Sequence, residues 1–430
     1  MKKAVLSNRI LMSYTDELFE KVVNELTYQI PSKVPGEPPY FKRLYSKIGD
    51  RIISIPIGCI HLIPKDYEIV DKRVNNPVEF PQFKYTLRQS QQDIYDQIDD
   101  NCIINANVSF GKTFTGIAIS TKLKQKTLVL VHTVYLRDQW VKEVEKTLGI
   151  APGIIGSGKV DDKGPIVIAN IQTFRKYINQ YKETFGTVIT DECHHCPSAM
   201  FEEALNKLKA RYKIGLSATL GRKDQLHVVL TDYFGKKIYR PPRENQLKPE
   251  INVIQTSIPF TSNMMIPWAT KVNELVGRED YFGLVTTLAS MYADTGRKVL
   301  VLADRTEFLE KCYTKHEDKS VLIIGATKNR DEAVELLKED DSINILYGAI
   351  SIFKEGISIN DLDTVILATP TNNEFMLEQI IGRILRKQEG KNTPIVVDIL
   401  LAGTTAKRQA KTRIAHYANN GYDIKYIDLR

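Results

Sequence analysis

The chain has 430 residues, which is enough for two or three domains with hydrophobic cores of their own. Its content of 43% hydrophobic and 26% charged residues is that of an ordinary soluble globular protein, and no apolar run approaches the roughly 18 residues that a membrane helix needs. The net charge of +7 fits a polyanion-binding protein without requiring one, and five scattered cysteines form no disulfide framework. With no secretory signal at the N-terminus, we expect an intracellular, cytoplasmic protein.

Residues 1–80 differ from the rest of the chain in their pattern of apolar residues and prolines. A helical pattern over residues 15–26 leads into a proline-rich break at 31–39, and two short β-like runs follow at 51–57 and 59–63. Another proline-marked connection lies at 76–81. This arrangement predicts a small α+β accessory domain.

Residues 81–242 alternate apolar strands with amphipathic helices, a rhythm that predicts a doubly wound parallel sheet. A proline-containing stretch at 240–249 then predicts an interdomain connection, and a second α/β rhythm fills residues 243–430, ending in a polar segment with basic residues at 407–408 and 411–413. Two α/β domains in tandem predict a cleft between them. The expected strands are 102–106, 127–131, 165–169, 187–190 and 212–216 in the first domain, and 298–303, 320–324, 343–349, 364–368 and 394–398 in the second.

The segment from Ala106 to Thr113, ANVSFGKT, has the pattern of a phosphate-binding loop between a strand and a helix. Lys112 would reach the β- and γ-phosphates, and the Thr113 hydroxyl would ligate Mg²⁺. The usual pattern has glycine where this chain has Ala106. A Gly-Lys-Thr tripeptide alone is weak evidence, so the prediction depends on a second signal.

That second signal is Asp191-Glu192, which ends an apolar strand about eighty residues later. The carboxyl edge of a parallel sheet is where α/β proteins bind ligands. Asp191 would hold Mg²⁺, and Glu192 would polarise the water that attacks the γ-phosphate. Two adjacent carboxylates can also be a solvated strand end, but together with the phosphate loop they favour a nucleotide hydrolase.

The sequence Cys193-His-His-Cys196 follows these carboxylates and could be half of a zinc site. Structural zinc needs four ligands, and the other three cysteines stand singly in the chain. We therefore do not expect a metal there.

Taken in order, several motifs resemble those of superfamily 2 helicases, and most closely those of phage branch-migration helicases of the UvsW and T5 type. The matching segments are LRQSQ at 87–91, LVHTVYLRDQW at 130–140, ANIQTF at 169–174, DECH at 191–194, GLSAT at 215–219, the stretch 348–359, and QIIGRILR at 379–386. The resemblance implies two tandem RecA-like doubly wound domains with a small N-terminal domain, ATP and Mg²⁺ as cofactors, and DNA as partner.

The resemblance also implies roles for individual residues. Nucleotide would be bound by Gln91, Ser109, Phe110, Gly111, Lys112, Thr113 and Gly356. Arg383 and Arg386 would act as arginine fingers from the second domain, with Gln379 beside them, while His194, Ser217, Ala218 and Thr219 would couple hydrolysis to nucleic acid. Nucleic acid would be contacted by Thr133, Arg137, Gln172, Thr173 and Lys354, mainly through its phosphates. Of the nearby aromatics, Phe353 could stack on bases, whereas Trp140 has the apolar neighbours of a core residue.

The implied function is an ATP-dependent DNA helicase or translocase that acts on branched DNA such as forks or Holliday junctions, in the host cytoplasm if a phage encodes it. Two alternatives stay open. One is an RNA helicase or a translocase that does not unwind, and the other is a nucleic-acid-binding scaffold with an inactive ATPase fold.

Overall fold

The computed structural model describes residues 2–32, 36–196, 198–221, 225–242, 247–355, 359, 361–371, 373–384 and 390–430. Two compact units divide the chain, Met1–Arg243 and Glu244–Arg430. Each is described by itself below. None of the helices in these described ranges combines the length and apolar character that a membrane crossing demands.

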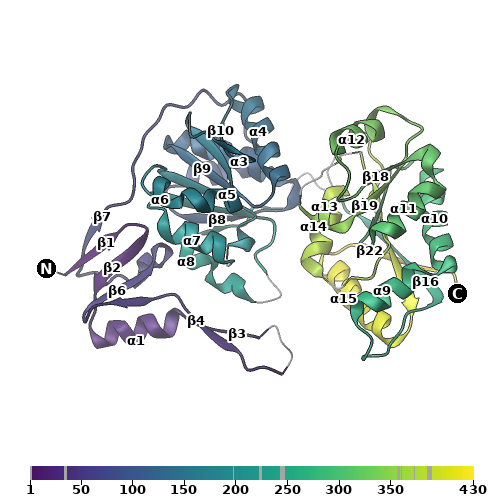
Figure 1. The fold of residues 1–430 in the computed structure, drawn as a ribbon, viewed down its shortest axis with the longest axis horizontal. Helices are drawn as coiled ribbons and strands as arrows, with labels where there is room; N and C mark the ends of the chain where they lie inside the picture. The colour runs from purple at the N-terminus through teal and green to yellow at the C-terminus, as the bar shows by residue number, and fades with distance from the viewer. Residues whose placement is uncertain are drawn as a thin grey trace. The chain divides into compact units, whose positions relative to one another are not determined.

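The N-terminal region of the first unit is built on a five-stranded sheet in the order β5-β6-β2-β1-β7, with a separate β3–β4 hairpin (Figure 1). Its elements are β1 (Lys3–Leu6), β2 (Arg9–Ser13), α1 (Asp16–Glu25), β3 (Thr27–Ile30), β4 (Tyr40–Arg43), β5 (Ser46–Ile48), β6 (Ile52–Pro56) and β7 (Glu68–Asp71). The predicted helix is confirmed as α1, with Thr15 capping it by accepting a hydrogen bond from the Leu18 N–H.

The predicted β-like run at 59–63 is wrong, because residues Ile57–Leu62 form a 3₁₀ helix. This helix packs against α8 (Leu230–Phe234) so closely that a Cβ added at Gly58 would lie 2.4 Å from the Thr231 carbonyl oxygen. Ile57, Cys59 and Leu62 of this segment are buried where the 3₁₀ helix contacts α8.

The rest of the first unit is an eight-stranded sheet in the order β11-β10-β12-β9-β13-β14-β8-β15, parallel except for the short β11. All five predicted strands are confirmed, and three further strands appear: β11 and β15 at the two edges, and β10 next to β11. The strands are β8 (Cys102–Asn105), β9 (Thr127–Val131), β10 (Gly153–Gly156), β11 (Lys159–Val160), β12 (Ile166–Asn170), β13 (Thr187–Asp191), β14 (Tyr212–Ser217) and β15 (Ile238–Tyr239).

Helices cover both faces of this sheet, as the continuous apolar sequences of its central strands require. One face packs against α2 (Gln89–Gln97), α3 (Lys112–Leu123) and α4 (Val134–Leu148). The other packs against α5 (Ile171–Phe174), α6 (Ile178–Tyr181), α7 (Ala199–Lys207) and α8, and its core continues without a break into the N-terminal sheet. The boundary at residue 80 stays a prediction, since the two parts share this core.

The second unit is a seven-stranded, fully parallel sheet in the order β18-β19-β17-β20-β21-β16-β22, several strands of which are labelled in Figure 1. The five predicted strands are confirmed as β17 to β21, and β16 and β22 were not predicted. Bounds are β16 (Glu250–Pro259), β17 (Val299–Ala303), β18 (Ser320–Ile323), β19 (Ile345–Ala349), β20 (Thr364–Leu367), β21 (Ile395–Ala402) and β22 (Asp423–Asp428), with helices α9 (Trp268–Val276), α10 (Glu279–Ala293), α11 (Thr306–Lys315), α12 (Arg330–Glu339), α13 (Ile350–Glu355), α14 (Glu374–Ile384) and α15 (Thr404–Asn419).

One member of the basic segment near the C-terminus is not a surface residue. Arg413 on α15 is 3% exposed and forms a two-point ion pair with Asp398 of β21, at 2.7 Å and 2.6 Å. Tyr417 donates a third hydrogen bond to the same carboxylate. Val397 and Ile399, the neighbours of Asp398 on β21, pack in one core with residues of α10 and α11. Asp398 points to the other face of the sheet, and its pairing with Arg413 fastens α15 there.

Candidate nucleotide and nucleic-acid site

The predicted phosphate loop joins β8 to α3 through a single 3₁₀ turn, Val108–Phe110. Gly111 ends that turn with φ +83°, in the left-handed region, and a Cβ added there would lie 3.0 Å from the Gln91 Nε2 atom. The left-handed conformation thus favours glycine at this position, and a side chain here would also press on the Gln91 amide. The turn directs the chain into the N-terminus of α3, where free backbone N–H groups and the helix dipole favour a phosphate.

Gln91 and Arg88 hold the phosphate loop from α2. The Gln91 amide donates to the Phe110 carbonyl oxygen at 2.8 Å and accepts from the Arg88 N–H at 3.0 Å, and the Arg88 guanidinium donates to the same carbonyl. Gln91 is only 3% exposed, and the Phe110 ring lies in the core. The predicted nucleotide residues Gln91 and Phe110 therefore meet at the loop, where Phe110 contributes its backbone.

Lys112 and Thr113 occupy the first turn of α3. The Lys112 ammonium donates to the carbonyl oxygens of Ala106 at 3.1 Å and Asn107 at 3.3 Å, so it lies over the loop. Ser109, Lys112 and Thr113 are all half-buried. A phosphate bound by the loop would replace these carbonyl contacts with a charge-assisted interaction.

Asp191 ends β13 and is 4% exposed. One of its oxygens accepts a 2.8 Å hydrogen bond from the Trp140 indole N–H, and the other accepts from the Glu192 N–H at 3.0 Å. Burial, and then the charge of Glu192, raise the pKa of Asp191 above its usual range, although the Trp140 hydrogen bond acts against this. Trp140 is fully buried, as predicted, but it also positions an acidic residue, which the sequence did not indicate.

Glu192 adopts a left-handed backbone, φ +49° and ψ +53°, which is uncommon for a residue with a side chain. Its carboxylate lies 3.2 Å from the His194 Nδ1 atom. Burial acts to raise the pKa of Glu192, but the hydrogen bond from His194 and the charges of Lys112 and the two histidines outweigh it and keep the pKa below its usual range. The site thus favours an ionised Glu192 beside a more weakly acidic Asp191.

His194 connects these carboxylates to the end of the neighbouring strand β14. Its Nδ1 atom is 2.9 Å from the Ser217 hydroxyl, which lies 2.6 Å from the Thr219 carbonyl oxygen and 3.4 Å from the Glu192 carboxylate. Ser217, Ala218 and Thr219 are all buried. The structure therefore brings together the four residues that the sequence predicted to couple hydrolysis to nucleic acid.

The two cysteines that flank the histidines both lie in the hydrophobic core. The Cys193 sulfur packs beneath β14, where a Cβ added at Gly215 would approach it to 2.9 Å. Among the described residues, no group of three or more His, Cys, Asp or Glu side chains is placed to hold a metal ion.

Four of the predicted nucleic-acid residues follow β9 and β12. The Thr133 hydroxyl caps α4 by accepting from the Leu136 N–H, and Gln172, which is exposed, donates to the His132 carbonyl oxygen. Thr173 is half-buried on α5.

Arg137, the fourth of these residues, is 8% exposed and bonds to Asp138, Ser157 and Asn170. Its guanidinium thus already makes several contacts within the domain. The assignment of all four residues to nucleic acid stays a prediction.

In the second unit, Gln379 is buried on α14, and its Oε1 atom has no hydrogen-bond partner among the described residues. Gly356, Arg386 and the side chains of Arg383 and Lys354 lie outside the described part of the structure. The prediction that Phe353 stacks on bases is wrong, because its ring is 1% exposed and packs against Gly348.

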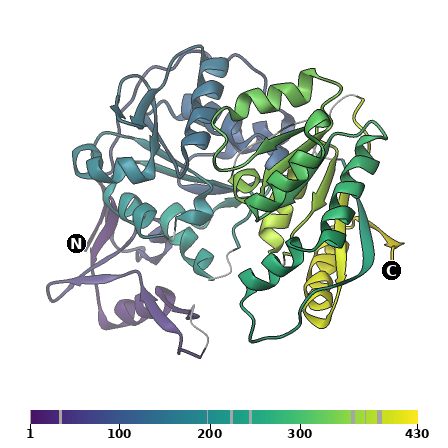
Figure 2. The ribbon, with the colours of Figure 1, turned by 45° about the vertical axis from the view of Figure 1, so that its right-hand side comes forward.

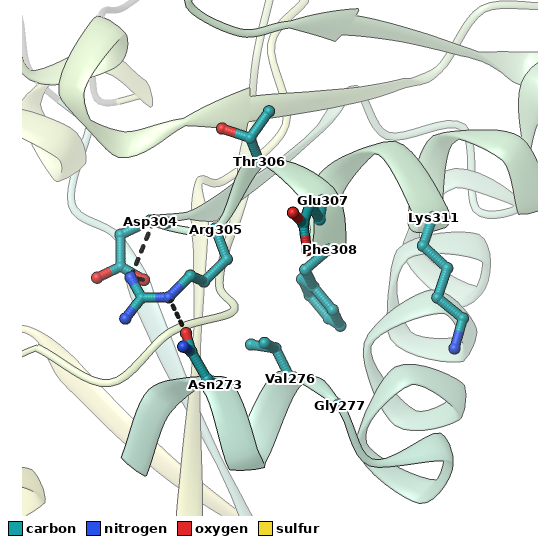
Figure 3. A pocket seen from close by; sticks show the side chains of 9 residues that line it. All are labelled: Asn273, Val276, Gly277, Asp304, Arg305, Thr306, Glu307, Phe308 and Lys311. Carbon is teal, nitrogen blue, oxygen red and sulfur yellow. Dashed lines mark hydrogen bonds and ion pairs between the residues drawn. The ribbon is translucent and has the colours of Figure 1, made fainter. Parts of the chain in front are cut away.

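A pocket of about 540 Å³ lies in the second unit between α9 and α11 (Figure 3). None of the predicted site residues lines it; its wall is Asn273, Val276, Gly277, Asp304, Arg305, Thr306, Glu307, Phe308 and Lys311. Arg305 points toward Asn273 and donates to its side-chain oxygen at 2.6 Å, and it also pairs with Asp304 at 3.1 Å. Its guanidinium is thus engaged within the protein, and the pocket is separate from the nucleotide motifs.

Comparison with known proteins agrees with this geometry. The family described as "Type III restriction enzyme, res subunit" matches residues 84–222, and the "Helicase conserved C-terminal domain" matches residues 283–388. "Probable helicase D10" of Escherichia phage T5 is 40% identical over 98% of this chain and 95% of its own length. "Putative ATP-dependent RNA helicase L396" of Acanthamoeba polyphaga mimivirus is 27% identical over 95% of this chain and 83% of its own.

Among solved structures, the fragment of an HsdR subunit of a type I restriction enzyme from Vibrio vulnificus shares the fold, with a TM-score of 0.61 at 22% identity, over 81% of this chain and 70% of that one. Tandem RecA-like sheets with a phosphate loop and a DExH sequence define an ATP-hydrolysing enzyme of the helicase class. Within that class, the chain belongs to the superfamily 2 helicases of the phage type.

Proposed function

We propose that this helicase uses ATP and Mg²⁺ to remodel branched DNA, such as replication forks or Holliday junctions, in replication, recombination or repair. The observation that carries the ATPase part is the hydrogen-bonded series Glu192–His194–Ser217–Thr219 beside the phosphate loop. The choice of branched DNA is supported by the resemblance of the motifs to those of phage branch-migration helicases and by the small N-terminal sheet that precedes the first ATPase domain.

In this proposal, the loop residues Ser109 to Thr113 bind the phosphates of ATP, Gln91 senses the adenine, and Gly356 completes the site. Glu192 polarises the attacking water, and its low pKa keeps it ionised for this task. Arg383 and Arg386 stabilise charge on the γ-phosphate, with Gln379 beside them.

The donors present fit Mg²⁺, which proteins bind through one or two carboxylates completed by phosphate oxygens and water. Thr113 and Asp191 would hold the ion. A cation there would also offset the repulsion between Asp191 and Glu192 that raises the pKa of Asp191. When bound, the ion would neutralise charge on the transferred phosphoryl group.

His194, Ser217, Ala218 and Thr219 transmit the state of the γ-phosphate to the nucleic-acid surface, where Thr133, Arg137, Gln172, Thr173 and Lys354 contact phosphates. Such contacts carry little base information, so binding should depend strongly on salt and weakly on sequence.

The test is steady-state ATP hydrolysis with Mg²⁺, alone and with single-stranded DNA, linear duplex, a four-way junction or RNA. Strongest stimulation by the junction supports the proposal. Stimulation by RNA alone would instead make the protein an RNA helicase, the activity named for some of its relatives. Equal stimulation by linear duplex and junction would indicate a duplex translocase, and no turnover under any condition would indicate a scaffold.

Glu192→Gln separates hydrolysis from binding. The variant should lose turnover by several orders of magnitude and retain ATP binding, because the amide cannot polarise the water but fills the same space. Surviving turnover would show that another residue polarises the water.

A further inference from the structure

Strand β4 of the β3–β4 hairpin and strand β5, which follows it, together carry several aromatic and basic side chains, some of them exposed. The ten residues 40–49, YFKRLYSKIG, hold three aromatic and three basic residues and no acidic one. Phe41 is 62% exposed and Tyr40 is 49% exposed, which places them among the most exposed large apolar side chains of the described chain. Exposed apolar side chains that gather at one place on a protein surface are typical of interaction sites.

One face of the hairpin contacts the first ATPase domain, and the other faces solvent. Strand pairing sets Gln29 opposite Phe41 and Tyr28 opposite Lys42, and side chains alternate between the two faces. On one face, Tyr28 donates a 2.7 Å hydrogen bond to Asp232 on α8, and Lys42 forms a 2.7 Å ion pair with Glu202 on α7. This face fastens the hairpin to the first ATPase domain.

The opposite face is turned to solvent. It presents Gln29, Phe41 and Arg43, which are all exposed. Two residues further along, Tyr45 stacks edge-on against Phe19 at 5.8 Å, and the Lys47 ammonium lies 4.1 Å above the Phe19 ring. The outward face of β4 therefore presents an aromatic ring beside a cation, and β5, which follows in the chain, adds a second cation over an aromatic ring.

The hairpin also projects from the N-terminal region, and prolines restrict its backbone. Both ribbon views show it extending beyond the five-stranded sheet (Figures 1 and 2). Pro38 and Pro39 directly precede β4, and their fixed φ angles limit the conformations of that strand's entry. Glu202 lies on α7, which follows the DExH segment in the chain. The Lys42–Glu202 ion pair therefore links the hairpin to the domain that contains the phosphate loop.

We propose that this hairpin is a strand-separating wedge that binds unpaired bases at the branch point of DNA, with Phe41 stacking on a base and Arg43 and Lys47 pairing with phosphates. Exposed aromatic rings flanked by cations suit single strands, since every base offers a π-face and every nucleotide a negative charge. An acidic protein partner would not explain the aromatic rings, and duplex DNA would not expose bases to them. The inference rests on the proposed action on branched DNA and assigns the contact to named residues.

Binding is tested with two ligands, a fork that has two unpaired arms and a blunt duplex of the same length. Phe41→Ala should weaken fork binding about tenfold, the loss of one base stack, and change blunt-duplex binding much less. Arg43→Ala combined with Lys47→Ala should weaken fork binding and reduce its salt dependence. Ile69→Ala is the matched control, an exposed apolar residue of β7 in the same region, and should behave like the wild type.

Stacking itself is tested with Phe41→Trp. The fluorescence of the added indole, taken as the difference from wild type, should be quenched by the fork and not by the blunt duplex. Coupling is measured as base pairs opened per ATP hydrolysed, which should fall about tenfold in Phe41→Ala and not in the control.

The possible failures are distinguishable. If the wild type and the control open forks with ATP and Phe41→Ala matches them, or if the Phe41→Trp indole is not quenched, the wedge is refuted while the proposed function stands. If the wild type shows no DNA-dependent turnover, the proposed function itself fails. Equal loss on fork and blunt duplex would make the hairpin a general duplex contact and would likewise overturn the wedge.

Discussion

Lys213 is a buried cation, and its removal should change how the stability of the first unit depends on pH. It lies on β14, is 1% exposed, and its ammonium donates to the Leu205 carbonyl oxygen at 2.5 Å, with the Asn8 carbonyl oxygen 3.5 Å away. Burial, and then the charge of Arg9, lower the pKa of Lys213 from 10.5 to about 7. The side chain thus bridges Asn8 of the N-terminal region and Leu205 of the ATPase domain, in surroundings that disfavour its charged form.

The size of the effect follows from the pKa difference. A shift of 10.5 − 7, or 3.5 pKa units, corresponds to an upper limit of ~5 kcal/mol at 1.36 kcal/mol per unit. Because the pKa of Lys213 is lower in the folded state, the unfolded chain binds the extra proton between pH 7 and pH 10.5. The free energy of unfolding should therefore rise with pH across this window, and the penalty is fully present below pH 7.

The experiment compares wild type with Lys213→Met at pH 7 and pH 10 by denaturant unfolding. A Trp268→Phe background leaves Trp140, which is buried in the first unit, as the sole tryptophan. From pH 7 to pH 10 the wild type should gain up to ~4 kcal/mol more than the Met variant. Lys209→Met, which removes a partly exposed ion pair with Glu183, should keep the wild-type slope. Parallel slopes for wild type and Lys213→Met would refute the burial argument.

Three further predictions concern named contacts. Trp140→Phe should destabilise the protein by ~2–4 kcal/mol and move the acid limb of the ATPase pH profile upward, because Asp191 loses a hydrogen bond that favours its ionised form; an unmoved profile would contradict this. Arg413→Met should cost ~3–5 kcal/mol of unfolding free energy by leaving Asp398 uncompensated in the core, and adding Asp398→Asn should recover much of it, whereas a neutral single variant would contradict the pairing. Lys112→Ala should weaken ATP binding at least tenfold in a fluorescent-nucleotide titration, and unchanged affinity would disprove its place in the phosphate site.

Much of the fold could be predicted from the sequence because central parallel strands are buried on both faces. Strands such as β9 and β12 consist of residues that are all buried, so their apolar runs are visible in the chain. The edge strand β22 could not be predicted in this way. Most of its residues are exposed, and it is held by backbone pairing with β16 from Glu250 to Gln255, a partner about 170 residues away.

The candidate site divides in the same manner. The phosphate loop and the DExH carboxylates are local patterns, so the sequence indicates them directly. The partner of Asp191 is 51 residues away, and the apolar surroundings of Trp140 predicted burial without showing where its N–H would point. The burial of Arg413 could not be predicted for a related reason. A charged residue in a helix is expected to be exposed unless its distant partner, here Asp398, is known.

The departures from the usual phosphate-loop pattern do not weaken the case for an active ATPase. A glycine is required only where the backbone is left-handed or too close to a neighbour for a Cβ. Among the described residues of this loop, Gly111 alone has a positive φ, so Ala106 and Ser109 stand where side chains are accommodated. Ala106 is buried and donates its N–H to the Ser217 carbonyl oxygen at 2.9 Å, which ties the start of the loop to the end of β14. The loop therefore has glycine at the one described position whose backbone is left-handed. The replacement of glycine by Ala106 and Ser109 is then no argument for an inactive scaffold.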